Sequence, residues 1–190
     1  FVAQLLNDLF GIQARAGCSC AGPYGHRLLG IDVERSKEFE REIVQGCEGI
    51  KPGWVRVNFN YFLSETVFDY LLQAVHLIAN EGYKLLPQYT FDPMTGLWAH
   101  RRELASPVMR LTDLSYRGGK LTYRARHASE PEWVLPSYLE EARRFFDAAV
   151  RDLSFEAPRD PITSADFEVL RWFPLPGETH RELAAAVISA

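Results

Sequence analysis

Reactive side chains gather in one short, glycine-rich segment of the chain. Residues 15–26 read Arg-Ala-Gly-Cys-Ser-Cys-Ala-Gly-Pro-Tyr-Gly-His, which sets an arginine, two thiols and an imidazole among glycines. Glycine lets the main chain adopt unusual dihedral angles and approach a ligand closely. An arginine can bind a carboxylate, and it can lower the pKa of a neighbouring thiol. The segment therefore predicts a loop that binds an anionic group or presents a nucleophilic cysteine.

The elements that would position this loop alternate between helices and strands. The expected elements are a helix over 2–10, a strand over 12–15, a helix over 34–47, a strand over 54–60 and a helix over 65–81. Gly11 is placed to end the first of these helices, Ser64 to cap the last one and Gly82 to stop it. This order predicts an α/β or α+β layer in which the loop lies next to a short sheet.

Residues 87–190 differ from the first 86 in their pattern, which indicates short strands, turns and several prolines. The turn sequences at 92–96 and 117–120 each predict a hairpin. Prolines on both sides of residues 167–173 predict a strand or an extended run there. The pairs that match a capping box, and so predict a helix start, are Ser137 with Glu140 and Thr179 with Glu182. We therefore expect an α+β extension that follows a first unit over residues 1–86.

Two motifs resemble a known enzyme family. The first consists of Arg15, Gly17, Cys20, Ala21 and Pro23, an arginine five residues before a cysteine that Ala-x-Pro follows. This frame resembles the cysteine desulfurases, which belong to the class V aminotransferase group of pyridoxal-phosphate enzymes. The second motif, Val55-Arg56-Val57 followed by residues 61–65, is similar to that family's strand-to-helix segment, whose arginine binds the substrate α-carboxylate. The resemblance covers residues 1–86.

The resemblance implies a fold and a setting for the chain. Residues 1–86 would be the small C-terminal domain of a fold-type I enzyme, a short sheet flanked by helices, and residues 87–190 its α+β extension. Pyridoxal phosphate would be held by a lysine of a large N-terminal domain, normally in a homodimer. That domain is missing from this chain, and the helix over 2–10 lacks an N-cap, so we expect an incomplete chain that is inactive alone.

The resemblance also implies roles for individual side chains. Arg56 and Arg15 would bind the carboxylate of an amino-acid substrate, although Arg56 could instead form a structural salt bridge. His26 would lie in the same site, or it could cap a short helix over 27–29. Cys20 would accept sulfur in a desulfurase, and it would have no covalent role in an aminotransferase. The reaction therefore stays open between transamination, cysteine desulfuration and another lyase reaction.

Two other functions compete with the enzyme hypothesis. Cys18, Cys20, His26 and Cys47 could together bind zinc, but only one residue separates the first two cysteines, whereas structural zinc motifs usually place two to four between them. A binding or regulatory module could also keep the same fold without the chemistry.

Composition narrows the class of protein further. The 190 residues are 47% hydrophobic with a net charge of −4, which predicts a globular chain without a basic surface for nucleic acid. No apolar run approaches the ~20 residues that a membrane-spanning helix needs. Three cysteines are too few for a disulfide framework and fit a reducing compartment. We therefore expect a cytoplasmic protein without nucleic-acid or membrane partners.

Overall fold

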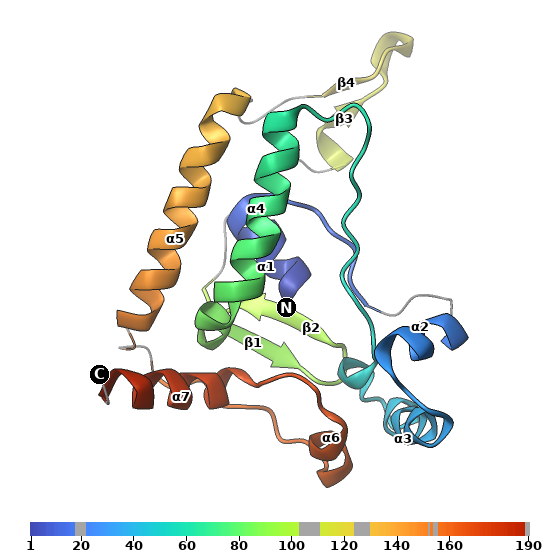
Figure 1. Ribbon diagram of the computed structural model, residues 1–190. Helices are drawn as coiled ribbons and strands as arrows, with labels where there is room; N and C mark the ends of the chain where they lie inside the picture. Colours follow the sequence, from blue (N-terminus) through green and yellow to red (C-terminus); the bar gives the residue numbers. More distant parts are fainter. Residues whose placement is uncertain (18–21, 103–110, 124–129, 152, 154–155, 189–190) are drawn as a thin grey trace.

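The computed structural model describes residues 1–17, 22–102, 111–123, 130–151, 153 and 156–188 (Figure 1). In these residues, helices are accompanied by two small antiparallel sheets, each with two strands. The chain therefore has a mixed α+β fold, as the sequence predicts.

The elements follow one another in the order of their labels in Figure 1. The α-helices are α1 (Val2–Phe10), α2 (Gly22–Leu29), α3 (Val33–Val44), α4 (Glu65–Glu81), α5 (Leu135–Arg151), α6 (Ala165–Leu170) and α7 (Pro176–Ile188). Short 3₁₀ helices are η1 (Glu48–Ile50), η2 (Gly82–Gln88), η3 (Leu111–Asp113), η4 (Arg117–Gly119) and η5 (Glu132–Val134). The strands are β1 (Tyr89–Asp92), β2 (Leu97–His100), β3 (Leu114–Ser115) and β4 (Thr122–Tyr123).

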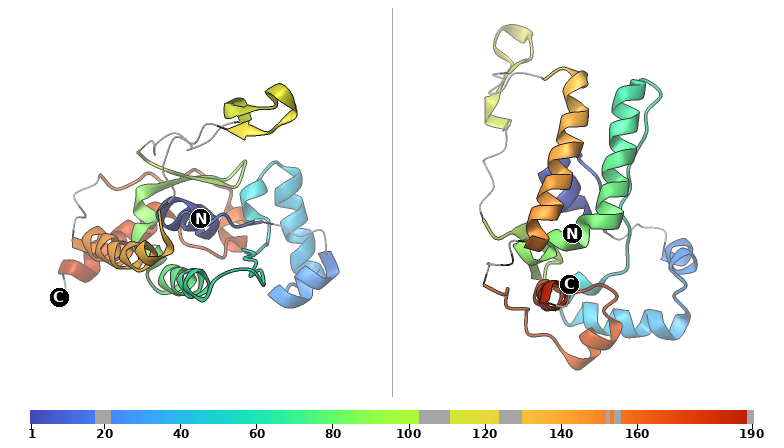
Figure 2. Two further views of the ribbon diagram at one scale, coloured as in Figure 1. Left: turned by 90° about the horizontal axis from the view of Figure 1, so that it is seen from above. Right: turned by 60° about the vertical axis from the view of Figure 1, so that its left-hand side comes forward.

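Helices α4 and α5 lie side by side, and α1 packs against both of them (Figures 1 and 2). Below them, α7 crosses the molecule and packs against η2, β1 and α5. The β1–β2 hairpin lies between these two groups of helices, while α3 and α6 pack together on one side. The small β3–β4 hairpin lies at the far end of the molecule.

The larger core forms where α1, α4, α5 and the start of β1 meet; we call it core 1. Its buried residues are Leu5, Leu6, Phe10, Ile12, Tyr70, Ala74, Ile78, Leu85, Tyr89, Leu139, Ala142, Phe146 and Ala149. Tyr70 donates its hydroxyl hydrogen to the Phe10 carbonyl oxygen at 2.9 Å, so its polar end is satisfied where α1 ends. Core 1 contains residues from both sides of residue 86, so the two parts of the chain pack as one body.

A second core joins α3, η1, β1 and α6; we call it core 2. Its buried residues are Phe39, Ile50, Phe91, Phe167, Leu170 and Leu175. Glu42 of α3 is also buried, at 2% exposed, and it accepts a hydrogen bond from the Ser164 hydroxyl at 2.9 Å. Trp98 of β2 packs against both cores and stacks on Phe91, with ring centroids 4.6 Å apart. The hairpin therefore connects the two cores.

Predictions that depend on local signals are confirmed. Helix α1 ends at Gly11, which adopts a φ of 65°, and the Ser64 hydroxyl caps α4 by accepting a hydrogen bond from the Val67 N–H at 3.2 Å. Both hairpins form at the expected turns, β1–β2 around 92–96 and β3–β4 around 117–120. In the first turn, Asp92 accepts hydrogen bonds from the Met94 N–H at 2.9 Å and the Thr95 hydroxyl at 2.7 Å.

Two predicted helix starts are wrong by a few residues. Helix α5 begins at Leu135, and the Ser137 hydroxyl donates to the Val134 carbonyl oxygen rather than capping the helix. Helix α7 begins at Pro176, and the Thr179 N–H already donates to the Leu175 carbonyl oxygen at 3.1 Å. A proline is favoured in the first turn, where its missing N–H would have no helical partner, so the prolines mark these starts better than the capping boxes do.

The strand or extended run expected over residues 167–173 is wrong for residues up to Leu170. Residues 165–170 form α6, which Ser164 caps by accepting a hydrogen bond from the Phe167 N–H at 2.9 Å. Phe167 and Leu170, three residues apart, are both buried in core 2. The flanking prolines limit the length of this helix but do not exclude it.

We expect Gly177→Ala to destabilise the protein. Asp160 accepts a hydrogen bond from the Gly177 N–H at 2.6 Å, and a Cβ at this position would lie 2.6 Å from the Pro158 carbonyl oxygen. Such overpacking costs about 1–3 kcal/mol, which urea denaturation followed by circular dichroism would measure. Glu182→Ala, at an exposed position of the same helix, is the control and should change the free energy of unfolding by less than about 0.5 kcal/mol. Equal stability of the two variants would contradict this packing.

Candidate functional site

Arg15 and Arg56 lie directly opposite each other on two extended segments. The Arg56 N–H donates to the Arg15 carbonyl oxygen at 2.8 Å, and the Arg15 N–H donates to the Arg56 carbonyl oxygen at 3.3 Å. A further hydrogen bond from the Trp54 N–H to the Gly17 carbonyl oxygen, at 3.4 Å, continues the same antiparallel register. The prediction of full strands over 12–15 and 54–60 is wrong, because the pairing is limited to this short ladder.

The two faces of the ladder have different surroundings. Ala14, Val55 and Val57 pack against core 1, whereas Arg15 and Arg56 are exposed. Successive side chains of an extended segment point to opposite faces, so the apolar positions anchor the ladder and the arginines lie on its outer face. Opposite residues of an antiparallel pair project to the same face with Cβ atoms about 5 Å apart. The structure therefore brings these two predicted residues together.

The charges of this pair are not balanced by the described parts of the chain. Neither guanidinium has an acidic partner among the residues that the structure describes. Like charges directly opposite each other on two paired strands destabilise the pair. Two forked donors on one face are suited to bind a carboxylate or another anion, which would remove that repulsion.

His26 lies apart from the arginines, in α2. It lines a pocket of about 240 Å³ between α2, α3 and residues 51–54, together with Trp54 and Phe39. A Cβ at Gly25 would lie 3.1 Å from the Trp54 ring, so the glycine allows α2 to approach the end of the ladder closely. Neither Arg15 nor Arg56 lines this pocket. His26 is therefore a neighbour of the ladder through Trp54, not a third member of the arginine pair.

Of the three cysteines, the structure describes only Cys47. Cys18 and Cys20 lie outside the described residues, so neither the nucleophile nor the zinc hypothesis is placed by the structure. Cys47 is half-buried, and burial together with the negative charge of Glu42 raises the pKa of its thiol. A thiol with a raised pKa is a poor nucleophile. Within the described ranges, no three His, Cys, Asp or Glu residues are grouped closely enough to hold a metal ion.

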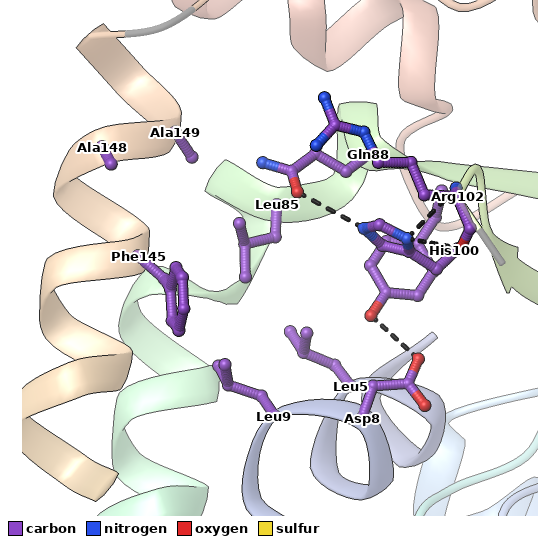
Figure 3. A pocket seen from close by; sticks show the side chains of 11 residues that line it. Leu5, Asp8, Leu9, Leu85, Gln88, His100, Arg102, Phe145, Ala148 and Ala149 are labelled. Carbon is purple, nitrogen blue, oxygen red and sulfur yellow. Dashed lines mark hydrogen bonds between the residues drawn. The ribbon is translucent and has the colours of Figure 1, made fainter. Parts of the chain in front are cut away.

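A larger pocket, of about 460 Å³, was not predicted from the sequence (Figure 3). We call it the α1–α5 pocket; its polar lining residues are Asp8, Gln88, Tyr89, His100 and Arg102. They come from α1, η2, β1 and the end of β2, so no spacing along the chain relates Asp8 to the others. The only local signal is Asp8 itself, a charged residue in a helix whose Leu5, Leu6 and Phe10 are buried.

Comparisons of the chain with protein-family models, with curated proteins and with solved structures found no match. None of the described helices combines the length and the apolar character that crossing a membrane requires.

Proposed function

We propose that this chain supplies the carboxylate-binding side of an active site that acts on an amino acid with pyridoxal phosphate. In this proposal, residues 1–86 are the small domain of a class V aminotransferase-like enzyme of fold type I, as their motifs imply. The observation that supports it most is the Arg15–Arg56 ladder, which sets two exposed guanidinium groups on one face. These are the two arginines that the family motifs select independently.

The ladder would orient the substrate. A backbone pair anchored on core 1 holds the start of both side chains, and each guanidinium can bind a carboxylate through two parallel hydrogen bonds. Fixing the carboxylate limits rotation of the substrate, so that one bond at its Cα is presented for reaction. Pyridoxal phosphate, when bound, would supply the electron sink for breaking that bond.

The lysine that holds the cofactor would come from outside this chain. Lys37, Lys51 and Lys84 each form an ion pair with a glutamate three residues earlier, and Lys120 follows the β3–β4 turn. None of these positions lies on the ladder or lines either pocket except Lys51, whose amine is paired with Glu48. The proposal therefore includes a separate cofactor-binding domain and, by resemblance, a homodimer. Cys20 decides between desulfuration and transamination, and both remain within the proposal.

We expect Arg56→Ala, in the full-length protein, to weaken amino-acid binding by about 10- to 150-fold, because a hydrogen bond to a charged group contributes about 1.5–3 kcal/mol. Cofactor binding should not change, since the lysine and the phosphate contacts lie elsewhere. Amino-acid titration of the cofactor's visible absorbance would measure the first quantity, and cofactor dialysis the second.

Arg117→Ala, which removes an exposed arginine from the β3–β4 turn, is the control and should leave both quantities unchanged. Equal losses of amino-acid and cofactor binding in Arg56→Ala would argue against a carboxylate anchor. A full-length protein that binds no pyridoxal phosphate would refute the enzyme proposal and favour a non-catalytic module.

A further inference from the structure

The α1–α5 pocket has the size and the lining of a small-molecule site. Its volume of about 460 Å³ falls in the range of ~300–1,000 Å³ that is typical of ligand pockets. Its lining shares no residue with the Arg15–Arg56 ladder or with the pocket around His26. The α1–α5 pocket is therefore a separate site from the one proposed above.

One end of this pocket is apolar. Leu9 of α1, Leu85 of η2 and Phe145 of α5 lie together at this end, while Asp8 and His100 lie at the other (Figure 3). Phe145 is 49% exposed, so packing within core 1 leaves about half of its surface available for contact with a ligand. An apolar group of a ligand would cover this exposed surface, and each Å² of apolar area buried contributes about 25 cal/mol of binding free energy.

The opposite end contains a carboxylate with unused capacity. Asp8 accepts hydrogen bonds at Oδ1 from the Gln4 amide at 2.8 Å and the Asn7 amide at 3.1 Å, and at Oδ2 from the Tyr89 hydroxyl at 3.0 Å. A carboxylate offers about four acceptor positions, so one position on Oδ2 is left. All three donors are neutral, and no cation of the described chain pairs with Asp8.

The groups around Asp8 hold it in place. Tyr89 is 2% exposed, and its ring meets the His100 ring edge-on with centroids 5.1 Å apart. Burial and the charge of Asp8 raise the pKa of Tyr89, so the phenol stays a donor to the carboxylate. His100 lies between the Arg102 carbonyl oxygen, 2.9 Å from its Nδ1, and the Gln88 amide oxygen, 3.5 Å from its Nε2. The Arg102 side chain points toward Gln88 and away from Asp8 (Figure 3).

We propose that the α1–α5 pocket binds a small organic cation, an ammonium group attached to an aromatic or branched apolar body. The ammonium donates to the remaining position on Asp8 Oδ2, and the apolar body contacts Leu9, Leu85 and Phe145. This occupant satisfies both ends of the pocket at once, whereas a carboxylic acid would place a second negative charge beside Asp8.

Three probes of one shape but different charge test this proposal. The chain is titrated by calorimetry with 2-phenylethylamine, with the neutral 2-phenylethanol and with the anionic phenylacetate. We expect the amine to bind at least about tenfold more tightly than the alcohol, as one charge-assisted hydrogen bond provides. Tighter binding of phenylacetate, or no saturable binding of any probe, would overturn the proposal.

Two variants test whether the probes bind in this pocket, and a third is the control. Asp8→Asn keeps the size of the side chain and removes its charge, so amine affinity should fall to that of the alcohol. Ala148→Trp, at an exposed lining position, should fill the pocket and abolish binding of all probes without disturbing a buried residue. Asp69→Asn, on the exposed face of α4, should change nothing. Amine binding that survives both pocket variants would overturn the assignment, and Ala148→Trp keeps the test valid if Asp8→Asn fails to fold.

Discussion

Replacing Phe146 by alanine is expected to lower the free energy of unfolding by about 3–5 kcal/mol, the range for a large aromatic side chain removed from a core. Phe146 is 1% exposed in core 1, on the helix that packs against α1 and α4. Typical domains have a total stability of only about 5–15 kcal/mol, so this loss should shift the urea midpoint strongly.

The neighbouring Phe145 gives a matched control, because it is the same residue type on the same helix but 49% exposed. Phe145→Ala should cost less than half as much as Phe146→Ala. If the alanine variant of Phe146 does not fold, Phe146→Leu keeps most of the volume and should cost less than about 1.5 kcal/mol. Equal losses for the two alanine variants would mean that α5 does not present this face to core 1.

Phe167→Ala should have an effect of similar size, about 3–5 kcal/mol, but on core 2. Phe167 is 0% exposed, and its ring centroid lies 6.4 Å from that of Phe91. Phe167 and Leu170 are the buried residues of α6, a short helix, so removing the larger of the two should loosen its packing against α3. Amide hydrogen exchange should therefore accelerate in α6 and along the α3 face that it covers, beyond the general loss of stability.

Val169→Ala is the control for this second prediction, since Val169 lies on the same helix and is 69% exposed. It should change the free energy of unfolding by less than about 0.5 kcal/mol. Retained exchange protection of α6 in Phe167→Ala would contradict the attachment described for core 2.

The sequence predicts most helices of this fold because their signals are local. The spacing of apolar residues from Val2 to Phe10 and the cap at Ser64 act over a single helical turn, and both lead to the observed elements. Over 12–15 and 54–60 the sequence predicts longer strands than form, because alternation signals an extended backbone but not how far two segments pair. For residues 165–170, the flanking prolines suggest an extended run, whereas the three-residue spacing of Phe167 and Leu170 matches the helix that forms.

The sequence points to candidate site residues only where they belong to a recognisable motif. Arg15 and Arg56 are 41 positions apart along the chain. Two separate motifs point to them, and the ladder places them opposite each other. His26 was expected beside them but lines a different pocket. The α1–α5 pocket has no sequence signature, because Asp8 and Tyr89 are 81 residues apart and meet only through tertiary packing.

The central place of α1 has a consequence for synthesis of the chain. Leu5 and Leu6 are each 1% exposed, and they share core 1 with Ala149 near the end of α5. On a ribosome that adds about 5–20 residues per second, these leucines wait on the order of 10 seconds for α5 to appear. During that interval α4 can already cover part of α1, but the surface that α5 will cover stays exposed, and exposed apolar surface of this kind is prone to aggregation.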